Sequence, residues 1–431
     1  MKRFADYFPG VPSAIGRAAR LLFRLRAQRV SNPDDHPLAP VFDAAYYRKQ
    51  LQALRPASSA TNPLEHYLTT GWRQGLDPHP LFSVRWYLDQ NPDVSAAGVE
   101  PLGHYLTSGW RENRRPHPHF NDIPYLSRHP ELLLANICPL LLLPQHPGLA
   151  SGPLQPARHW PSYYPRSRPY PYLAPEVMAA KINAYRATKG RSNKTAFCTC
   201  IIGGYDTLRL PEHLSPEIDY ILFTDQPTDG YGVFDVRLLQ SQETDRARTS
   251  RKVKLQPHLY LADYDLIVWC DANIIIRMDI LPFLAAFTAS GAPLAFLPNQ
   301  VYNCIYQQAV DCVHTQRDRP ETVVHQMLAL QREGYPADNG LIEANFFACR
   351  PQHPATPLFF DAWREQLHRG SRRDQLSANY VLWKQGLSYF PLLGDRQSTC
   401  THPGTALLVH GTYDADHFAQ AAAIALQSSA P

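Results

Sequence analysis

The strongest chemical signal in the sequence is a carboxylate and a side-chain amide that directly follow an apolar run. Asp271 and Asn273 come after the run from 266 to 270, and apolar residues without alternation are typical of a strand buried on both faces of a sheet. Ligands of open α/β sheets bind beyond the carboxyl ends of such strands. Oxygen ligands there suit Mn²⁺ or Mg²⁺, which would in turn hold a phosphate. Asn brings no charge, however, and Asp-Ala-Asn is also a common turn at a strand end.

Two further apolar runs are expected to form strands that end near the same place. The first breaks into Gly203 and Gly204 and continues with Tyr205 and Asp206, and the second ends on Asp225. A pair of glycines allows a tight loop whose backbone approaches a ligand closely. On its own this signal is weak, because any strand can end in this way.

The segment from 246 to 258 is rich in basic residues and precedes the strand that ends on Asp271. If the segment is helical, its i, i+3, i+7 spacing places Arg251, Lys254 and His258 on one face. A fixed cationic face beside a metal site would offset the charge of a diphosphate, and Arg can grip a phosphate through two hydrogen bonds. A solvated basic helix is the alternative interpretation, and the sequence leaves both open.

Three polar residues later in the chain complete the set of candidates. Glu343 lies near the start of a glycine-led strand predicted from 340 to 350. Asp374 and Gln375 open a predicted helix. Because an acid at a helix start is commonly a cap, capping is the structural alternative for Asp374.

Length and composition predict a multidomain globular protein. A chain of 431 residues is too long for one compact core, so two or three domains are expected. The composition, 44% hydrophobic and 19% charged, is that of a globular protein. The eight cysteines include no Cys-x-x-Cys and stand mostly inside apolar runs, which favours a reducing compartment and argues against structural zinc.

The positive charge of the chain is concentrated at its amino terminus. Residues 1–29 hold seven Lys or Arg against one acid, whereas the whole chain carries +4. Apolar residues at helical spacing from Val11 to Val30 predict an amphipathic helix within a basic segment of residues 1–30, either at an anionic membrane surface or against solvent or a partner. No run of eighteen apolar residues and no secretion signal is present. We therefore expect a cytoplasmic protein, with peripheral membrane association as one possibility, and no nucleic-acid partner.

An internal repeat of about 38 residues occupies 40–136. Three motifs of its first unit recur 38 residues later: His66-Tyr67-Leu68 as His104-Tyr105-Leu106, Gly71-Trp72-Arg73 as Gly109-Trp110-Arg111, and Pro78-His79-Pro80 as Pro116-His117-Pro118. Repeats of this length bury aromatic faces by stacking, so we expect short helices in each unit. The histidines are interpreted as contacts between helices rather than as metal ligands.

A proline-rich segment from 137 to 175 separates the repeats from the α/β domain predicted over 176–425. Ten prolines follow Cys138 up to and including Pro175, so this stretch cannot form a helix or a central strand. We interpret it as a linker, or as a strap over a domain surface.

The order of the motifs resembles a known family. Ile-Ile-Gly-Gly-Tyr-Asp, Phe-Thr-Asp, Ser-Arg-Lys-Val-Lys, Trp-x-Asp-Ala-Asn, Glu-Gly-Tyr-Pro, Gly-Leu-x-Glu and Arg-Arg-Asp-Gln-x-Ser occur in that order between 194 and 390. This set is similar to the glycosyltransferase-like family of bacteria and plants with mucilage-related plant members, and more distantly to glycogenin-type enzymes. The repeats resemble those that precede bacterial polysaccharide glycosyltransferases.

The resemblance implies a GT-A, Rossmann-like nucleotide-sugar domain behind a mainly α-helical repeat region. It implies a metal-dependent, retaining glycosyltransferase that moves a sugar from a nucleotide sugar to a glycan or glycolipid acceptor in bacterial surface polysaccharide synthesis. The implied roles divide by residue. The metal, Mn²⁺ or Mg²⁺, would be bound by Asp271, Asn273 and His410. The nucleotide-sugar donor would be bound by Gly203, Gly204, Tyr205, Asp206, Asp225, Arg251 and Lys254. The transferred sugar and the acceptor would be contacted by Asp374, Gln375 and Glu343.

Two other functions remain open from the sequence. A metal-dependent hydrolase could use the same carboxylates with water as the acceptor. A non-catalytic glycan-binding or assembly protein could retain the fold, and the uncharged Asn273 keeps that alternative open.

Overall fold

The computed structural model describes residues 36–54, 62–112, 114–143, 148, 170–190, 193–240, 246–411 and 415–428. The amphipathic segment predicted over 1–30 lies outside these residues, as does most of the proline-rich segment. The described residues fall into two compact units, those within Met1–Arg158 and Tyr306–Ala329, and those within His159–Ile305 and Leu330–Pro431. The sequence had placed Tyr306–Ala329 inside the predicted domain 176–425, whereas its contacts group it with the first unit.

The first unit is built from short helices. In chain order these are α2 (Ala44–Leu54), α3 (Pro63–His66), η3 (Tyr67–Gly71), η4 (Trp72–Gln74), α4 (Val84–Gln90), α5 (Pro92–Ala97), α6 (Pro101–His104), η5 (Tyr105–Gly109), α7 (Ile123–Leu126), η6 (Pro130–Ala135) and α8 (Pro139–Leu142). The segment Tyr306–Ala329, called here the inserted segment, lies mostly in the helices α13 (Ile305–His314) and α14 (Pro320–Arg332). The π-helical turns η3 and η5 are separated by the 38-residue period.

The histidines of the two His-Tyr-Leu motifs contact tyrosines of an earlier helix in the same repeat. Tyr47 Oη lies 2.8 Å from His66 Nδ1, and 38 to 40 residues later Tyr87 Oη lies 2.9 Å from His104 Nδ1. The glycine five residues after each of these histidines leaves room for the hydroxyl, because a Cβ would lie 1.8 Å from the Tyr47 oxygen on Gly71 and 2.2 Å from the Tyr87 oxygen on Gly109. These hydrogen bonds confirm the interpretation for His66 and His104, whereas His79 and His117 accept from the amides of Leu81 and His119.

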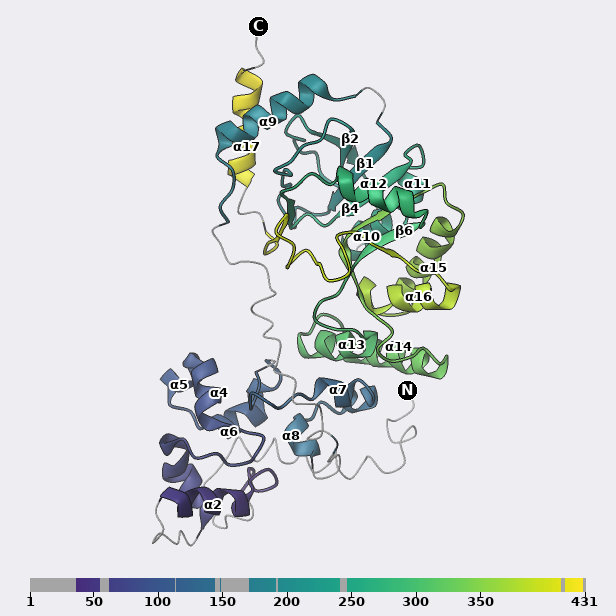
Figure 1. Cartoon of the computed structure of the whole chain (residues 1–431). Coiled ribbons are helices and arrows are strands. Elements are labelled where there is room, and N and C mark those ends of the chain that lie inside the picture. Colours follow the sequence, from purple (N-terminus) through teal and green to yellow (C-terminus); the bar gives the residue numbers. More distant parts are fainter. Residues whose placement is uncertain are drawn as a thin grey trace. The chain divides into compact units, whose positions relative to one another are not determined.

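The second unit is a mixed α/β structure (Figure 1). Its strands are β1 (Thr195–Ile201), β2 (Ile218–Thr224), β3 (Phe234–Leu238), β4 (Leu266–Cys270), β5 (Ile274–Ile276), β6 (Leu294–Pro298), β7 (Ile342–Cys349), β8 (Phe390–Pro391) and β9 (Thr405–Leu407). Its helices are α9 (Pro175–Thr188), α10 (Arg246–Leu255), α11 (Pro257–Tyr260), α12 (Leu281–Ser290), α15 (Ala355–Arg369), η9 (Asp374–Leu376), α16 (Ala378–Gln385) and α17 (Ala415–Gln427). The predicted α/β class is confirmed.

Among the described residues, seven strands form one sheet in the order β3-β2-β1-β4-β7-β6-β8, and β5 pairs with β9 in a second, two-stranded sheet. The strands β1, β2, β3 and β4 are parallel, whereas β7 runs antiparallel to both β4 and β6. Helices α9 and α17 pack against each other at one end of the unit (Figure 1). Because β1, β2 and β4 run in one direction, their carboxyl ends lie at one edge of the sheet, where ligands of α/β sheets bind.

No described helix combines the length and the apolar character needed to cross a membrane.

Candidate functional site

The loop after β1 is tied to the end of β2. The amide nitrogen of Gly203 donates to Asp225 Oδ1 at 2.7 Å. Gly203 and Gly204 adopt φ of +67° and +62°, a left-handed conformation that glycine adopts without strain. The structure thus brings together the predicted glycine loop and the predicted acid of the second strand.

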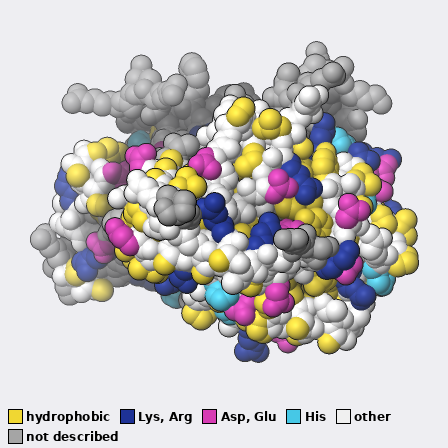
Figure 2. Space-filling model, turned by 90° about the horizontal axis from the view of Figure 1, so that it is seen from above, with side chains coloured by type: hydrophobic (Ala, Val, Ile, Leu, Met, Phe, Trp, Pro, Cys, Tyr) yellow, Lys and Arg dark blue, Asp and Glu magenta, His cyan; other side chains and the backbone are white. Residues whose placement is uncertain are grey.

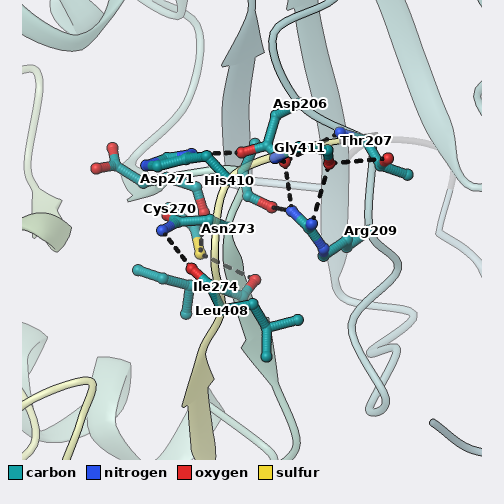
Figure 3. Close-up of polar contacts among 11 residues, drawn as sticks. Asp206, Thr207, Arg209, Cys270, Asp271, Asn273, Ile274, Leu408, His410 and Gly411 are labelled. Carbon is teal, nitrogen blue, oxygen red and sulfur yellow. Dashed lines mark hydrogen bonds and ion pairs between the residues drawn. The ribbon is translucent and has the colours of Figure 1, made fainter. Parts of the chain in front are cut away.

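Asp206 is the centre of a buried polar cluster (Figure 3). Its Oδ1 lies 2.6 Å from Arg209 Nη1, and its Oδ2 lies 2.6 Å from His410 Nδ1. Burial alone would raise the pKa of Asp206, but the hydrogen bond from His410 and the charge of Arg209 bring it below its ordinary value. Asp206 is therefore an ionised carboxylate that orients the His410 ring.

Arg209 is a site residue that the sequence reasoning missed. Its Nη1 also donates to the carbonyl of Ala272 at 2.9 Å, so it connects the β1 loop to the Asp-Ala-Asn turn. Its side chain is only 1% exposed. The available signal was its position three residues after Asp206, which is too common a spacing to identify a buried ion pair.

Asp271 lies directly after β4, as predicted, and is held by two donors. Its Oδ1 accepts from Trp269 Nε1 at 2.7 Å and from Lys254 Nζ at 3.2 Å. Its backbone amide donates to the carbonyl of Asn345 on β7 at 2.8 Å. The side chain remains 31% exposed, and its Oδ2 has no hydrogen-bond partner among the described residues.

Lys254 joins the two acids that the sequence placed far apart. Its Nζ lies 2.8 Å from Asp374 Oδ2, and Arg251 Nε lies 4.0 Å from the same oxygen. Burial alone would raise the pKa of Asp374, but the charges of Lys254, Arg251 and Arg373 bring it well below its ordinary value. Two members of the predicted cationic face therefore reach the site.

His258, the third member of that face, does not join the site. Helix α10 ends at Leu255, and Pro257 begins α11. Proline has no backbone N–H to donate to the preceding turn, so α10 cannot continue through Pro257. The His258 ring stacks on Phe360 with centroids 6.0 Å apart, and burial lowers its pKa. It belongs to the packing between α11 and α15.

Asp374 combines a local backbone contact with the ion pair. Its Oδ1 accepts from the amide of Gln375 at 3.1 Å, while its Oδ2 faces Lys254. The helix predicted to open here begins as the 3₁₀ turn η9, and α16 starts only at Ala378. Asp374 is therefore not a helix cap, because Arg373 holds the N-cap position of η9 without a side-chain cap bond. Lys254 instead connects Asp374 to Asp271.

Glu343 and Gln375 are turned toward neighbouring segments. Glu343 is 8% exposed, and its Oε2 accepts from Thr399 Oγ1 at 3.2 Å. Burial raises the pKa of Glu343 to about 7, although hydrogen bonds from Thr399 oppose the shift. Gln375 Nε2 donates to the carbonyl of Ile342 at 3.4 Å. These contacts fasten β7 to the segments that follow it.

Asn273 is directed at the backbone rather than at open space. It is 5% exposed, and its Nδ2 donates to the carbonyl of Leu408 at 2.9 Å (Figure 3). The amide of Leu408 returns a hydrogen bond to the carbonyl of Asn273 at 2.8 Å. The side-chain amide therefore extends the pairing of β5 with β9.

The side chains near β4 could bind a cation only if a substrate supplied further oxygen ligands. Asp271 offers Oδ2, and His410 offers Nε2 because its Nδ1 faces Asp206, an arrangement common for metal-binding histidines. Among the described residues, no three His, Cys, Asp or Glu side chains are grouped to hold a metal. The donors suit an ion that takes its remaining ligands from phosphate and water.

Comparisons with known proteins give only remote structural likenesses. No family model matches the chain, and no curated protein matches it. The apo structure of mouse xyloside xylosyltransferase 1 aligns with a TM-score of 0.29 and 10% identity, over 46% of this chain and 84% of that one. The mannosyltransferase Ktr4p of S. cerevisiae aligns with a TM-score of 0.26 and 9% identity, over 51% of this chain and 78% of that one. Likenesses this weak do not assign a function.

Proposed function

We propose that the second unit is a glycosyltransferase of GT-A type that moves a sugar from a nucleotide-sugar donor to a glycan or glycolipid acceptor. The observation that carries this proposal is the convergence of Asp271, Lys254 and Asp374 beside the carboxyl end of β4. Parallel strands place such a cluster where α/β proteins bind nucleotides. In keeping with the resemblance of the repeats, the acceptor would be a bacterial surface polysaccharide or its lipid-linked precursor.

The donor would lie along the edge formed by the parallel strands. The loop held by the bond from Gly203 to Asp225 offers a preformed backbone surface for the nucleoside, with Tyr205 exposed beside it. Arg251 and Lys254 supply positive charge for the diphosphate. Fixed cations stabilise negative charge that grows on a leaving phosphate, because they need no reorganisation during the reaction.

Asp271 and His410 would hold Mn²⁺ or Mg²⁺ against the diphosphate. When bound, the metal supplies Lewis-acid stabilisation of the leaving group. Asp206 keeps the His410 ring oriented with Nε2 available. Asn273 acts in this proposal by holding the turn that presents Asp271, since its amide is engaged by Leu408.

Asp374 would stabilise positive charge that develops at the anomeric carbon of the sugar. Its low pKa keeps it ionised at neutral pH. Glu343 is proposed not to act as a base for an acceptor hydroxyl, because its Oε2 accepts from Thr399; its burial does not distinguish it from Asp374, which is buried as well. Both observations favour a retaining reaction, in which the departing phosphate takes the acceptor proton.

On the face drawn in Figure 2, acidic and basic side chains are interspersed over the described residues, without a broad basic surface. A nucleic-acid partner would call for clustered positive charge.

Thermal unfolding of the full chain tests the donor class. A panel of UDP-, GDP-, dTDP- and CMP-sugars is measured with and without Mn²⁺, and one nucleotide sugar should raise the Tm more with Mn²⁺ than the two separate shifts together. No shift with any nucleotide sugar would count against a transferase. Release of free sugar from a glycan with no nucleotide sugar present would instead identify a hydrolase.

The product of the first turnover tests the stereochemistry. Proton NMR should show that the anomeric configuration of the donor is kept. Asp374→Asn should lower kcat much more than it weakens donor binding, as for an interaction made in the transition state. An inverted product would remove the retaining assignment.

A further inference from the structure

The described end of the proline-rich segment lies on the two-stranded sheet of the second unit. Tyr170 is 5% exposed, and Tyr172 packs beside it in the same apolar cluster. The other members of this cluster come from β5, from β9 and from the residue that follows β9: Ile275, Ala406 and Leu408. Residues 170–172 are called the tyrosine strap here.

Pro171 holds the two tyrosines of the strap next to each other. The amide of Tyr172 donates to the carbonyl of Tyr170 at 2.9 Å, which is the i to i+2 bond of a γ-turn. The fixed φ of proline suits the centre of such a turn. The two rings meet edge to face with centroids 4.8 Å apart. Because the turn fixes the backbone, each tyrosine has its own set of partners.

Tyr170 is bonded at the end of β5 that lies away from the candidate metal site. Its Oη donates to Glu212 Oε1 at 3.0 Å, and Glu212 Oε2 lies 3.2 Å from Arg277 Nε. Arg277 directly follows β5, whereas Asp271 precedes that strand. Tyr170 therefore has no hydrogen bond to the residues that hold Asp271 or His410 among its described contacts.

Tyr172 is bonded to Arg209. A guanidinium group has only donors, so the phenol oxygen of Tyr172 accepts from it. The Tyr172 ring packs against α17, with centroids 4.9 Å from His417 and 5.4 Å from Phe418. The ring contacts fix the phenol, and the phenol oxygen in turn limits the positions open to the Arg209 side chain.

Arg209 holds three parts of the candidate metal site together (Figure 3). Besides Asp206 and the carbonyl of Ala272, it contacts the carbonyl of Gly411, to which Nη2 donates at 3.3 Å. Ala272 and Gly411 directly follow the two candidate metal ligands, Asp271 and His410. A displacement of this guanidinium would therefore affect both ligands.

We propose that Tyr172 is a positioning residue for the metal site of the second unit. It fixes Arg209, and Arg209 orients Asp206 and with it the His410 ring. This inference rests on the proposed function, in which Asp271 and His410 hold the metal. Asp206 Oδ1 also accepts from the amides of Thr207 and Gly411, so the loss of Tyr172 should loosen the site rather than abolish it.

The substitution Tyr172→Phe tests the proposal because it removes the phenol oxygen and keeps the ring. Electron paramagnetic resonance measures the affinity of the full chain for Mn²⁺ in the presence of the nucleotide sugar that gives the largest Tm shift. Loss of a residue that orients a metal ligand weakens metal binding about 10–100-fold. Tyr172 acts one contact further away, so we expect Mn²⁺ to bind about three- to tenfold more weakly.

The matched control is Tyr170→Phe in the same strap. It removes the hydrogen bond to Glu212 and keeps the ring, so the two variants should have similar Tm values. Its Mn²⁺ affinity should stay within about twofold of the parent. Equal weakening of Mn²⁺ in both variants would show that the strap only supports the sheet, and an unchanged affinity in Tyr172→Phe would equally overturn the proposal.

Nitrogen-15 NMR of the His410 ring tests the same contacts without any nucleotide sugar, and His410→Gln identifies the signal. In the neutral ring of the parent the proton should sit on Nδ1, because this nitrogen faces Asp206. Tyr172→Phe should increase the fraction of rings with the proton on Nε2, and Tyr170→Phe should match the parent. An unchanged tautomer in Tyr172→Phe would overturn the proposal. If Mn²⁺ and nucleotide sugar show no joint effect in the parent, the proposed function fails, and the tautomer alone then decides whether Tyr172 orients His410.

Discussion

Lys254 Nζ lies 2.8 Å from Asp374 Oδ2, and each side chain is 7% exposed, so a buried ion pair links α10 to the turn η9. The same ammonium lies 3.2 Å from Asp271 Oδ1. One cation thus neutralises two carboxylates at the edge of the sheet. A diphosphate that enters this edge must share Lys254 with both acids.

Removal of the Lys254 charge should destabilise the fold. Lys254→Met leaves Asp374 buried without its nearest cation, and breaking a buried pair in this way costs about 3–5 kcal/mol. Urea denaturation at pH 7 measures the free energy of unfolding. The control Lys384→Met breaks the exposed pair with Glu333 and should leave stability nearly unchanged. Equal effects of the two substitutions would show that Lys254 is not buried as described.

Glu343 should make stability fall as the pH rises toward neutrality. Its pKa is raised from 4.5 to about 7 by burial, so between these values the folded state binds a proton that the unfolded state has lost. Stability is then lost as the pH rises from about 4.5 to about 7, by up to about 3 kcal/mol. Glu343→Gln, which stays neutral, should be the more stable protein at pH 8 and similar to the parent at pH 4.5. Parallel stability curves for the two proteins from pH 4.5 to 8 would contradict the shift.

Asn273→Asp should destabilise the protein without tightening Mn²⁺. The substitution removes the donor to the Leu408 carbonyl and places a carboxylate oxygen against it, at a cost of about 1–3 kcal/mol. Thermal unfolding and an Mn²⁺ titration with nucleotide sugar measure the two effects. Tighter Mn²⁺ with an unchanged Tm would mean that the side chain faces the cation instead.

His410→Ala should separate metal binding from stability. The His410 side chain is 44% exposed, so its loss should change the Tm little. If His410 Nε2 binds the metal, the extra Tm shift that Mn²⁺ gives with nucleotide sugar should disappear. Asp206→Asn, which disturbs the orientation of the ring, should weaken Mn²⁺ about 10–100-fold. An undiminished effect of Mn²⁺ in His410→Ala would exclude this histidine as a ligand.

The strand ends could be predicted from sequence because they depend on local patterns. Unbroken apolar runs identified β2 and β4, and parallel pairing then required Asp225 and Asp271 to share an edge. The charge pattern predicted that Arg251 and Lys254 share a helix face. It also placed His258 there, but α10 ends before Pro257 and His258 belongs to the next helix, α11. The spacing of residues in the sequence was enough to predict the position of a side chain wherever the residues around it in the structure are also close to it in the sequence.

The partners of the side chains could not be predicted, because they join distant parts of the chain. Asp206 meets His410 across 204 residues, and Asn273 meets Leu408 across 135. Whether Asn273 faces a cation or a carbonyl depends on the pairing of β5 with β9, which three-residue strands do not reveal in sequence. The burial of Glu343 likewise depends on Thr399, which no motif indicated.

The inserted segment also limits how the protein can be divided. The chain enters the first unit a second time at Tyr306 and leaves it after Ala329, and α13 and α14 bury Val310, Val323 and Met327. A truncated protein that begins at the proline-rich segment would keep these helices but lose the partners they have in the first unit. The contact of His314 with Asp122 would be lost, so we expect such a fragment to be less stable than the full chain. Two fragments cut between 138 and 175 should instead remain bound to each other after proteolysis.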